Sequence, residues 1–225
     1  MRAYEIEIKS LLGSKEKADA LKDKLKEVDP STKLVSSNTQ LNHYFIDGDF
    51  EKLYKAVEPL FLKDNANKLK EIIDEGRDFS VRTREIDGKI LLVIKASIDD
   101  TTSANGISRM EFEEEAKDKT LDELDKILLD AGFKYQAKWS RERKEYICKG
   151  TSVSIDKNAG YGYLAEFERM ISDESESNEA QRELRALMDE VGVAELAQDR
   201  LERMFAHYNE HWPEYYGTDK IFVIE

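Results

Sequence analysis

Charged and apolar residues alternate along several stretches of the chain, and the first of these stretches opens the sequence. Within residues 4–12, Glu5, Glu7 and Lys9 stand at every second position between apolar neighbours. Side chains of a β-strand point alternately to its two faces, so this spacing predicts a strand with one charged and one apolar face. Runs at 107–115 and 163–170 repeat the pattern. We therefore expect a protein rich in amphipathic strands.

Apolar residues at helical spacing separate these strands. The spacing predicts helices within 14–28, 50–75, 120–132 and 184–208. Thr120 and Glu123 have the spacing of a capping box at the start of one helix, and Gly132 is placed to end it. We predict one strand-rich domain at 1–171 with a helical insertion at about 50–78, and a helical C-terminal extension at 172–225 that packs on it.

The strongest local signal is a β-hairpin around Asp87 and Gly88. An Asp-Gly pair between two strand-like runs is typical of a two-residue turn. The turn fixes a register that places Ile86 opposite Lys89, Arg84 opposite Leu91, Arg82 opposite Val93 and Ser80 opposite Lys95. Three cations, Arg82, Arg84 and Lys95, are then expected on one face of the hairpin.

Composition narrows the class of protein. The 225 residues are 40% hydrophobic, enough for a core, and 35 Lys and Arg against 48 Asp and Glu give a formal net charge of -13. A chain this acidic does not wrap DNA or coat an anionic membrane by bulk attraction. No apolar run is long enough to span a membrane, the first nine residues lack a secretory signal, and Cys148 has no second cysteine to pair with. We expect a cytoplasmic protein, monomeric or homodimeric, that binds neither DNA nor membranes.

The charged faces of the predicted strands contain equal numbers of both signs. The cations are Lys9, Arg82, Arg84, Lys95, Arg109, Arg141 and Arg143, and the anions are Glu5, Glu7, Glu111, Glu113, Asp156, Glu166 and Glu168. For one strand alone, the ordinary interpretation is a half-buried sheet with its charges in water. Together, the strands favour a sheet closed into a barrel with these groups inside and helices outside.

A charged interior is costly unless its groups are paired, coordinated to metal or matched by a ligand. Arginine and lysine suit phosphate oxygens, and clustered carboxylates bind hard divalent cations. The two sets in one cavity predict a site for a metal and a polyphosphate. His43, which lies beside Tyr44 and Phe45, is expected to be a packed histidine rather than a catalyst.

Six motifs of the chain occur in an order that resembles the CYTH superfamily, also called triphosphate tunnel metalloenzymes. They are EIEIK at 5–9, VRTR at 81–84 with Lys95, R-x-E-x-E at 109–113, R-x-R at 141–143, Asp156, and G-x-x-x-E-x-E at 162–168. The resemblance covers residues 4–169. It implies an α+β fold with a closed, eight-stranded antiparallel β-barrel, the triphosphate tunnel, and helices packed outside it.

The resemblance also implies roles for individual residues. Glu5, Glu7 and Lys9 match the catalytic strand, in which two glutamates bind metal and a lysine contacts phosphate. The matched phosphate ligands are Lys9, Arg82, Arg84, Lys95, Arg109, Arg141 and Arg143. The matched metal ligands are Glu5, Glu7, Glu111, Glu113, Asp156, Glu166 and Glu168. The chain departs from the family at Tyr161 and Val93, where leucine and threonine are usual.

Three functions remain open at this stage. Members of the superfamily hydrolyse tripolyphosphate, thiamine triphosphate, nucleoside triphosphates or RNA 5′ ends, or convert ATP to cyclic AMP and pyrophosphate as class IV adenylyl cyclases. We favour a hydrolase of a small-molecule triphosphate that depends on Mg²⁺ or Mn²⁺, because a cyclase also needs an adenine pocket, which the sequence does not reveal. The third possibility is a non-catalytic module that binds polyphosphate or nucleotides.

Overall fold

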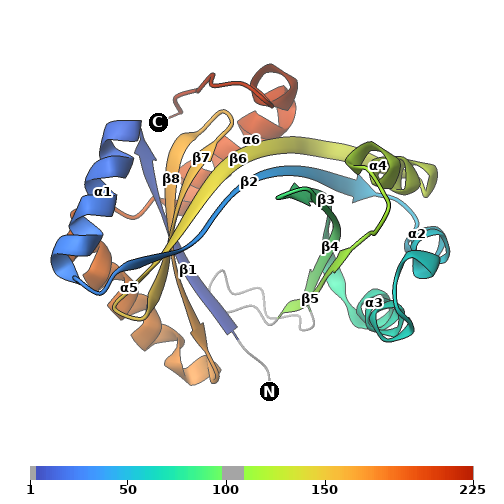
Figure 1. Ribbon diagram of the computed structural model, residues 1–225, viewed down its shortest axis with the longest axis horizontal. Helices are drawn as coiled ribbons and strands as arrows, with labels where there is room; N and C mark the ends of the chain where they lie inside the picture. Colours follow the sequence, from blue (N-terminus) through green and yellow to red (C-terminus); the bar gives the residue numbers. More distant parts are fainter. Residues whose placement is uncertain (1–3, 98–108, 225) are drawn as a thin grey trace. The chain divides into compact units, whose positions relative to one another are not determined.

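The computed structural model describes residues 4–97 and 109–224, apart from the side chains of Tyr4, Glu5, Arg109 and Glu174 (Figure 1). The polar stretch at 101–106, which lacks apolar residues to anchor it and is therefore expected to be a loop, lies outside this part. The elements in chain order are β1 (Tyr4–Gly13), α1 (Lys15–Val28), β2 (Lys33–Asp47), α2 (Phe50–Val57), α3 (Lys63–Glu75), β3 (Arg77–Ile86), β4 (Lys89–Ser97), β5 (Arg109–Glu115), α4 (Leu121–Asp130), β6 (Phe133–Cys148), β7 (Thr151–Asn158), β8 (Gly162–Ile171), α5 (Ser177–Val191) and α6 (Gln198–Tyr215).

The eight strands form one antiparallel sheet with the order β1-β8-β7-β6-β2-β3-β4-β5. The predicted α+β fold with eight antiparallel strands is confirmed. The predicted closure into a barrel is wrong: β1 and β5 end the strand order, and no ladder joins them among the described residues. Alternating polarity fixes which face of a strand is charged, but closure depends on strand tilt and stagger, which that pattern does not encode.

The β3–β4 hairpin forms with the predicted register. Ser80 lies opposite Lys95, Arg82 opposite Val93, Arg84 opposite Leu91 and Ile86 opposite Lys89. Asp87 and Gly88 adopt φ angles of 50° and 78°. Positive φ at both central residues is what a type I′ turn requires, and this turn matches the twist of the two strands.

The contacts of the chain divide it into two compact units. The first unit contains residues 4–39 and 140–224, and the second contains 40–97 and 109–139 among the described residues. The boundaries fall inside β2 and β6, so each of these two strands contributes to both units. No helix in the described part of the chain is both long and apolar enough to cross a membrane.

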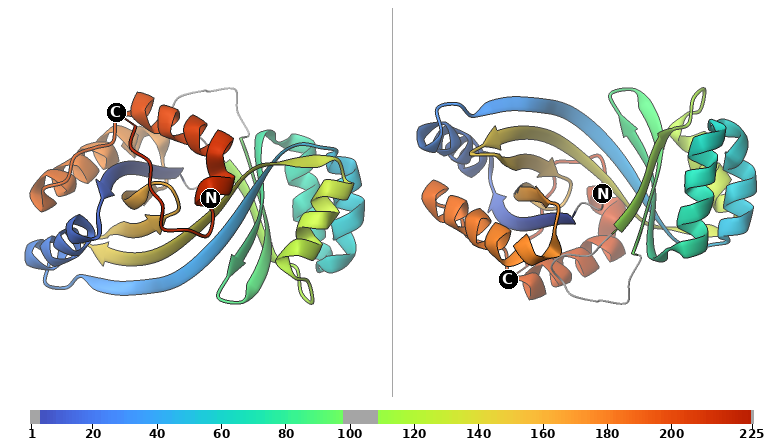
Figure 2. Two further views of the ribbon diagram at one scale, coloured as in Figure 1. Left: turned by 90° about the horizontal axis from the view of Figure 1, so that it is seen from above. Right: turned by 90° about the horizontal axis from the view of Figure 1, so that it is seen from below.

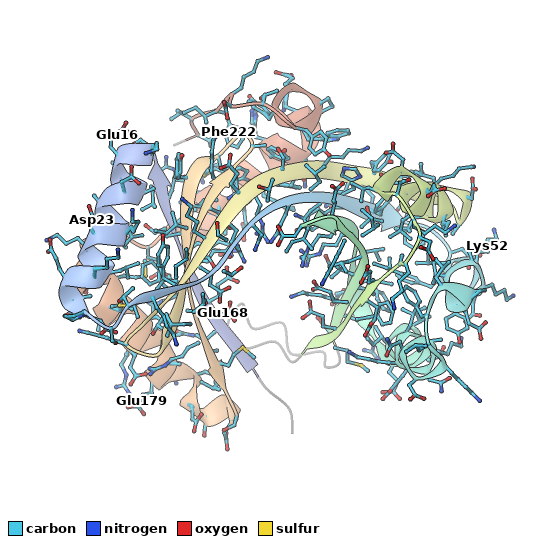
Figure 3. The ribbon with its side chains drawn as sticks, in the orientation of Figure 1. Glu16, Asp23, Lys52, Glu168, Glu179 and Phe222 are labelled. Atoms are coloured by element: carbon cyan, nitrogen blue, oxygen red, sulfur yellow. The ribbon has the colours of Figure 1, made fainter. Side chains whose placement is uncertain are left out.

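In the first unit, α1 and α5 pack on the apolar face of β1 and β8 (Figure 2). Ser14 caps α1, and its buried Leu21 and Leu25 meet Leu184 of α5 in one core. The outer faces of these helices carry exposed charges, among them Glu16 and Glu179 (Figure 3). Each helix therefore buries one apolar stripe and leaves its polar face to water.

In the second unit, α3 and α4 contact β3, β4 and β5, with α2 beside them (Figure 2). Leu92, Ile94, Phe112 and Leu124 are fully buried in this core. The predicted capping box at the start of α4 is present, since the side chain of Thr120 accepts from the backbone N–H of Glu123 and the Glu123 carboxylate accepts from that of Thr120.

Candidate functional site

Four neighbouring strands of the first unit carry charged side chains on one face. β1 pairs with β8, β8 with β7, and β7 with β6. The register places Glu7 opposite Glu168 and Lys9 opposite Glu166. Ile8, which lies between Glu7 and Lys9, is buried in the core on the other face. The alternation that builds the core thus gathers the charges of separate strands on the opposite face.

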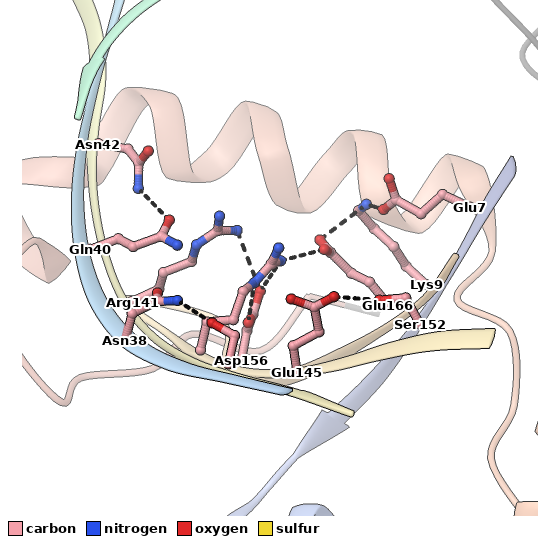
Figure 4. Close-up of polar contacts among 12 residues, drawn as sticks. Glu7, Lys9, Asn38, Gln40, Asn42, Arg141, Glu145, Ser152, Asp156 and Glu166 are labelled. Carbon is pink, nitrogen blue, oxygen red and sulfur yellow. Dashed lines mark hydrogen bonds and ion pairs between the residues drawn. The ribbon is translucent and has the colours of Figure 1, made fainter. Parts of the chain in front are cut away.

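Glu166 lies between two cations of this face (Figure 4). The Lys9 Nζ atom is 3.2 Å from the Oε1 atom of Glu166, and it also pairs with the Glu7 carboxylate. Arg143 pairs with the other carboxylate oxygen of Glu166 through its Nη2 atom. These side chains remain 18–29% exposed, so a ligand can reach them from solvent.

Asp156 extends this chain of ion pairs towards Arg141. The Arg143 Nε atom donates to Oδ1 of Asp156 at 2.8 Å, and its Nη2 atom donates to Oδ2 at 2.6 Å. Arg141 donates to the same Oδ2 atom at 3.4 Å. Asp156 is only 1% exposed, so these cations provide the charge compensation that a buried carboxylate requires.

The ion pairs hold the site in its ionised form. Burial alone would raise the pKa of Glu166, but the attraction of Lys9, Arg143 and Arg141 outweighs it and lowers that pKa well below its usual range. Burial likewise opposes the charge on Arg143, yet its hydrogen bonds and attraction to Asp156 and Glu166 raise its pKa above the usual value. Both groups are therefore charged at neutral pH.

We expect Glu166→Gln to destabilise the protein near neutral pH but not in acid. The folded pKa of Glu166 is depressed, so its carboxylate contributes stability above the unfolded pKa of about 4.3 and loses it as pH falls through the folded value. The difference in the free energy of unfolding should be on the order of 1–3 kcal/mol at pH 7. Urea unfolding of wild type and variant across this pH range measures it.

Glu179→Gln, on the exposed surface of α5, is the matched control and should cost almost nothing at any pH. Protonated glutamate and glutamine are nearly isosteric, so the wild type and Glu166→Gln should converge in stability at low pH. A loss of stability that is equal at all pH values would contradict the ionised state assigned to Glu166.

The second unit carries a separate charged face on β3, β4 and β5. The Arg84 Nε atom donates to Oδ1 of Asn42 at 2.8 Å, and its Nη1 atom donates to Oε1 of Glu113 at 2.9 Å. Lys95 lies 3.2 Å from Glu111. These cross-strand pairs join the cations of the hairpin to the carboxylates of β5.

Arg82 is held by an aromatic side chain of β2. Its Nη1 atom donates to the hydroxyl group of Tyr44 at 2.9 Å, and its guanidinium carbon lies 4.9 Å from the centre of the Tyr44 ring. The Nε atom of Arg82 is buried and has no hydrogen-bond partner among the described residues. Buried donors without a partner are uncommon in folded proteins.

The structure brings together most of the predicted site residues within each unit. The first unit holds Glu7, Lys9, Arg141, Arg143, Asp156, Glu166 and Glu168, and the second holds Arg82, Arg84, Lys95, Glu111 and Glu113. The side chains of Glu5 and Arg109 lie outside the described part. Their roles, like those of the other residues, stay predictions.

Sequence reasoning missed four residues that complete these faces. Asn42 and Tyr44 hold the hairpin arginines, as described above. On the first unit, the hydroxyl group of Ser152 donates to Glu145 at 2.9 Å beside the ion pairs (Figure 4). Glu145 is two positions beyond Arg143, so the alternation of β6 was a signal for it. Asn42 and Tyr44 depend on the pairing of β2 with β3, which no local pattern shows.

A cavity of about 420 Å³ in the first unit is lined by residues of β6, β7 and β8 and by the tail that follows α6. Arg141 lines it together with Lys157 and with residues that follow α6. Lys157 holds this tail through an ion pair of 2.6 Å with Asp219, and the backbone N–H of Gly217 donates to the Ser140 hydroxyl at 3.0 Å. Arg141 thus belongs both to the cavity wall and to the chain of ion pairs.

The acidic residues of the charged face could ligate a divalent cation, since such cations prefer carboxylate oxygens. Their arrangement is not that of a formed metal site. Among the side chains that the structure describes, no three acidic, histidine or cysteine groups converge on one point. Lys9 and Arg143 occupy carboxylate oxygens of Glu166 instead. A metal would therefore have to share or replace these contacts.

Comparison with known families shows where the chain belongs. The family model of the CYTH domain matches residues 73–200, more than half of the chain. The chain belongs to the CYTH domain family. The resemblance stated from the motifs is confirmed, although the matched residues begin after the Glu5–Lys9 motif and continue beyond residue 169 through α5.

Solved structures share the fold of this CYTH chain. The PH1819 protein of Pyrococcus horikoshii is 20% identical with a TM-score of 0.60, covering 91% of this chain and 99% of its own. A candidate adenylate cyclase of Vibrio parahaemolyticus is 16% identical with a TM-score of 0.59, covering 92% and 99%. A conserved hypothetical protein of Pyrococcus furiosus is 19% identical with a TM-score of 0.57, covering 87% and 93%. At these identities the likeness establishes the fold alone. No curated protein sequence matches this CYTH chain.

Proposed function

We propose that the protein hydrolyses a triphosphate with the help of a divalent cation. The observation that supports this most is the chain of alternating charges on one face of the first unit, from Glu7 through Lys9, Glu166, Arg143 and Asp156 to Arg141. Membership of the CYTH family, whose known activities act on triphosphates, agrees with it.

The cations of this face are suited to bind phosphate oxygens. Arg141 and Arg143 are 18–19% exposed and Lys9 is 28% exposed, so each can add a phosphate contact to its present carboxylate contact. Guanidinium groups bind phosphate through parallel N–H donors, and an ammonium group acts as a point charge. Carboxylate partners hold these cations in place before the ligand arrives.

In the proposed reaction, the oxygen of a water molecule forms a bond to the terminal phosphorus, and the bond from that phosphorus to the bridging oxygen breaks. The proton lost by water passes to solvent or to a carboxylate of the site, and the shorter polyphosphate leaves. Lys9 and Arg143 would offset the negative charge that grows on the bridging and terminal oxygens. A bound Mg²⁺ or Mn²⁺ would supply further charge neutralisation when present.

We propose that the cations of the second unit also bind phosphate oxygens. Tyr44 of β2 holds Arg82 through a neutral hydrogen-bond acceptor, and Arg84 contacts the neutral Asn42 of β2 as well as the Glu113 carboxylate. The buried Nε donor of Arg82 without a partner among the described residues is consistent with an anionic ligand.

The adenylyl cyclase activity remains a second candidate because of one observation. A cyclase must hold the adenine and ribose of ATP as well as its phosphates, and the cavity beside Arg141 offers about 420 Å³ for an organic group. In that reaction the ribose 3′-oxygen attacks the α-phosphorus and pyrophosphate leaves. The cavity is equally open to the organic part of a substrate that is hydrolysed.

The products separate these functions. The protein should be incubated with tripolyphosphate, thiamine triphosphate and nucleoside triphosphates, each with Mg²⁺, with Mn²⁺ and with a chelator. We expect orthophosphate from at least one substrate in the presence of metal, and none with the chelator. Cyclic AMP and pyrophosphate from ATP would identify the cyclase instead. If neither product forms under any condition, hydrolysis is refuted and a binding module is favoured.

A further inference from the structure

A buried aspartate lies on the apolar side of the second unit, among leucines of α4. Asp125 is 1% exposed, whereas its neighbours on the same helix face, Leu121, Leu124 and Leu128, belong to the hydrophobic core. Burying a carboxylate has a free-energy cost, whereas burying a leucine at this position would be favourable. Stability of the core therefore does not explain an aspartate at this position.

Asp125 joins two strands through its two carboxylate oxygens. Its Oδ1 atom accepts from the Thr83 hydroxyl of β3 at 2.5 Å, and its Oδ2 atom lies 2.6 Å from Nδ1 of His43 in β2. Oδ2 also accepts from the hydroxyl of Tyr135 at 2.7 Å. His43 and Thr83 are direct cross-strand partners. A single side chain from the helix thus fixes one cross-strand pair.

The residues on either side of this pair form the arginine face. Along β2, His43 stands between Asn42 and Tyr44, and along β3, Thr83 stands between Arg82 and Arg84. The same register places Asn42 opposite Arg84 and Tyr44 opposite Arg82. Since successive side chains of a strand point to opposite faces, the Asp125 contacts lie directly behind both arginine contacts.

Asp125 remains ionised in this position. Burial acts to raise its pKa, but hydrogen bonds from His43, Thr83 and Tyr135 outweigh burial and lower the pKa below its usual value. Lys138, 3.8 Å from Oδ2, adds a nearby positive charge. The carboxylate can thus serve as a fixed acceptor for donors from β2, β3 and β6.

We propose that Asp125 is a positioning residue that fixes the orientation of Arg82 and Arg84, the arginines proposed to bind phosphate oxygens in the second unit. It acts through His43 and Thr83 and does not touch the substrate. This inference rests on the proposed function. A displacement of about 1 Å in a group that holds the substrate can cost on the order of 100-fold in rate, so holding the two strands at this point has a measurable consequence.

The test compares Asp125→Asn with two variants of the same helix. Asp130→Asn makes the same change at an exposed position, and Leu128→Val perturbs the same core without touching the network. We expect Asp125→Asn to lower kcat/KM for the best triphosphate about 10- to 100-fold, and both controls to stay within about twofold. Thr83→Val, which removes one donor only, should give a smaller loss in the same direction and provides a second variant if Asp125→Asn folds poorly.

A combined variant distinguishes positioning from general loss of stability. If Asp125 acts through the two arginines, adding Asp125→Asn to a protein that already carries Arg82→Ala and Arg84→Ala should lower kcat/KM by less than about threefold further, because both targets of the positioning are gone. The inference would be overturned if the losses of kcat/KM multiplied in full in the combined variant. It would also be overturned if Leu128→Val lowered kcat/KM as much as Asp125→Asn does. A wild-type protein that neither hydrolyses nor binds any triphosphate would instead refute the proposed function, and the inference with it.

Discussion

Replacing Glu7 with glutamine is expected to abolish turnover while the protein stays folded. The Glu7 carboxylate is about a third exposed, at 29%, and pairs with Lys9, so its neutralisation removes one negative charge without opening the core. It lies opposite Glu168, and like charges directly opposite each other destabilise a sheet, a cost that a bound cation would offset. We expect kcat to fall at least about 100-fold, together with a higher requirement for Mg²⁺ or Mn²⁺.

The measurement is kcat over a range of metal concentrations, with the urea midpoint as a test of folding. Glu179→Gln makes the same substitution at an exposed position of α5 and should leave kcat and the metal requirement unchanged. Wild-type turnover by Glu7→Gln at low metal concentration would show that Glu7 has no part in the reaction. A large shift of the urea midpoint would show that its role is in folding.

Removal of Arg143 is expected to affect stability and turnover together. Asp156 is 1% exposed and loses its two short hydrogen bonds in Arg143→Ala, which leaves it the 3.4 Å contact with Arg141 among the residues that the structure describes. Breaking a buried pair by removing one partner typically costs about 3–5 kcal/mol of unfolding free energy. Turnover should be lost as well, because the proposed phosphate contact of Arg143 disappears.

A double-mutant cycle separates these two effects. In Arg143→Ala with Asp156→Asn no buried charge is left without its partner, so the combined loss of stability should be clearly smaller than the sum of the single losses. Turnover should not return in the double variant. Arg182→Ala, on the exposed face of α5, is the control. Additive losses would mean that Arg143 and Asp156 contribute independently, contrary to their geometry.

The local chemistry of the chain was enough to predict the faces of the strands and the β3–β4 register. Asp87 and Gly88 adopt positive φ angles that few other residue pairs tolerate, so the turn, and with it the positions of Arg82 and Arg84, follows from two residues. The helix beginning after Thr120 was likewise determined by a cap that spans four residues. These features depend on neighbours in the sequence.

The remaining features depend on partners that are distant in the sequence. The hydrogen bonds of Asn42 and Tyr44 to the arginines require β2 to pair with β3, although α2 and α3 separate the two strands in the chain. In the sequence, Asp125 lies on the same helix face as the core leucines of α4. A polar residue at such a position was the available signal for its buried hydrogen bonds. Whether eight strands close on themselves depends on tilt and stagger summed over the sheet, which no single strand determines.

The continuity of β2 and β6 limits how this protein can be divided or recombined. Each of these strands belongs partly to one unit and partly to the other, with boundaries at 39/40 and 139/140. A fragment that ends at either boundary would carry a severed strand with unsatisfied backbone groups, which promote aggregation. Neither unit can therefore be exchanged with that of a relative as a self-contained module, and chimaeras should be joined in the turns between strands instead.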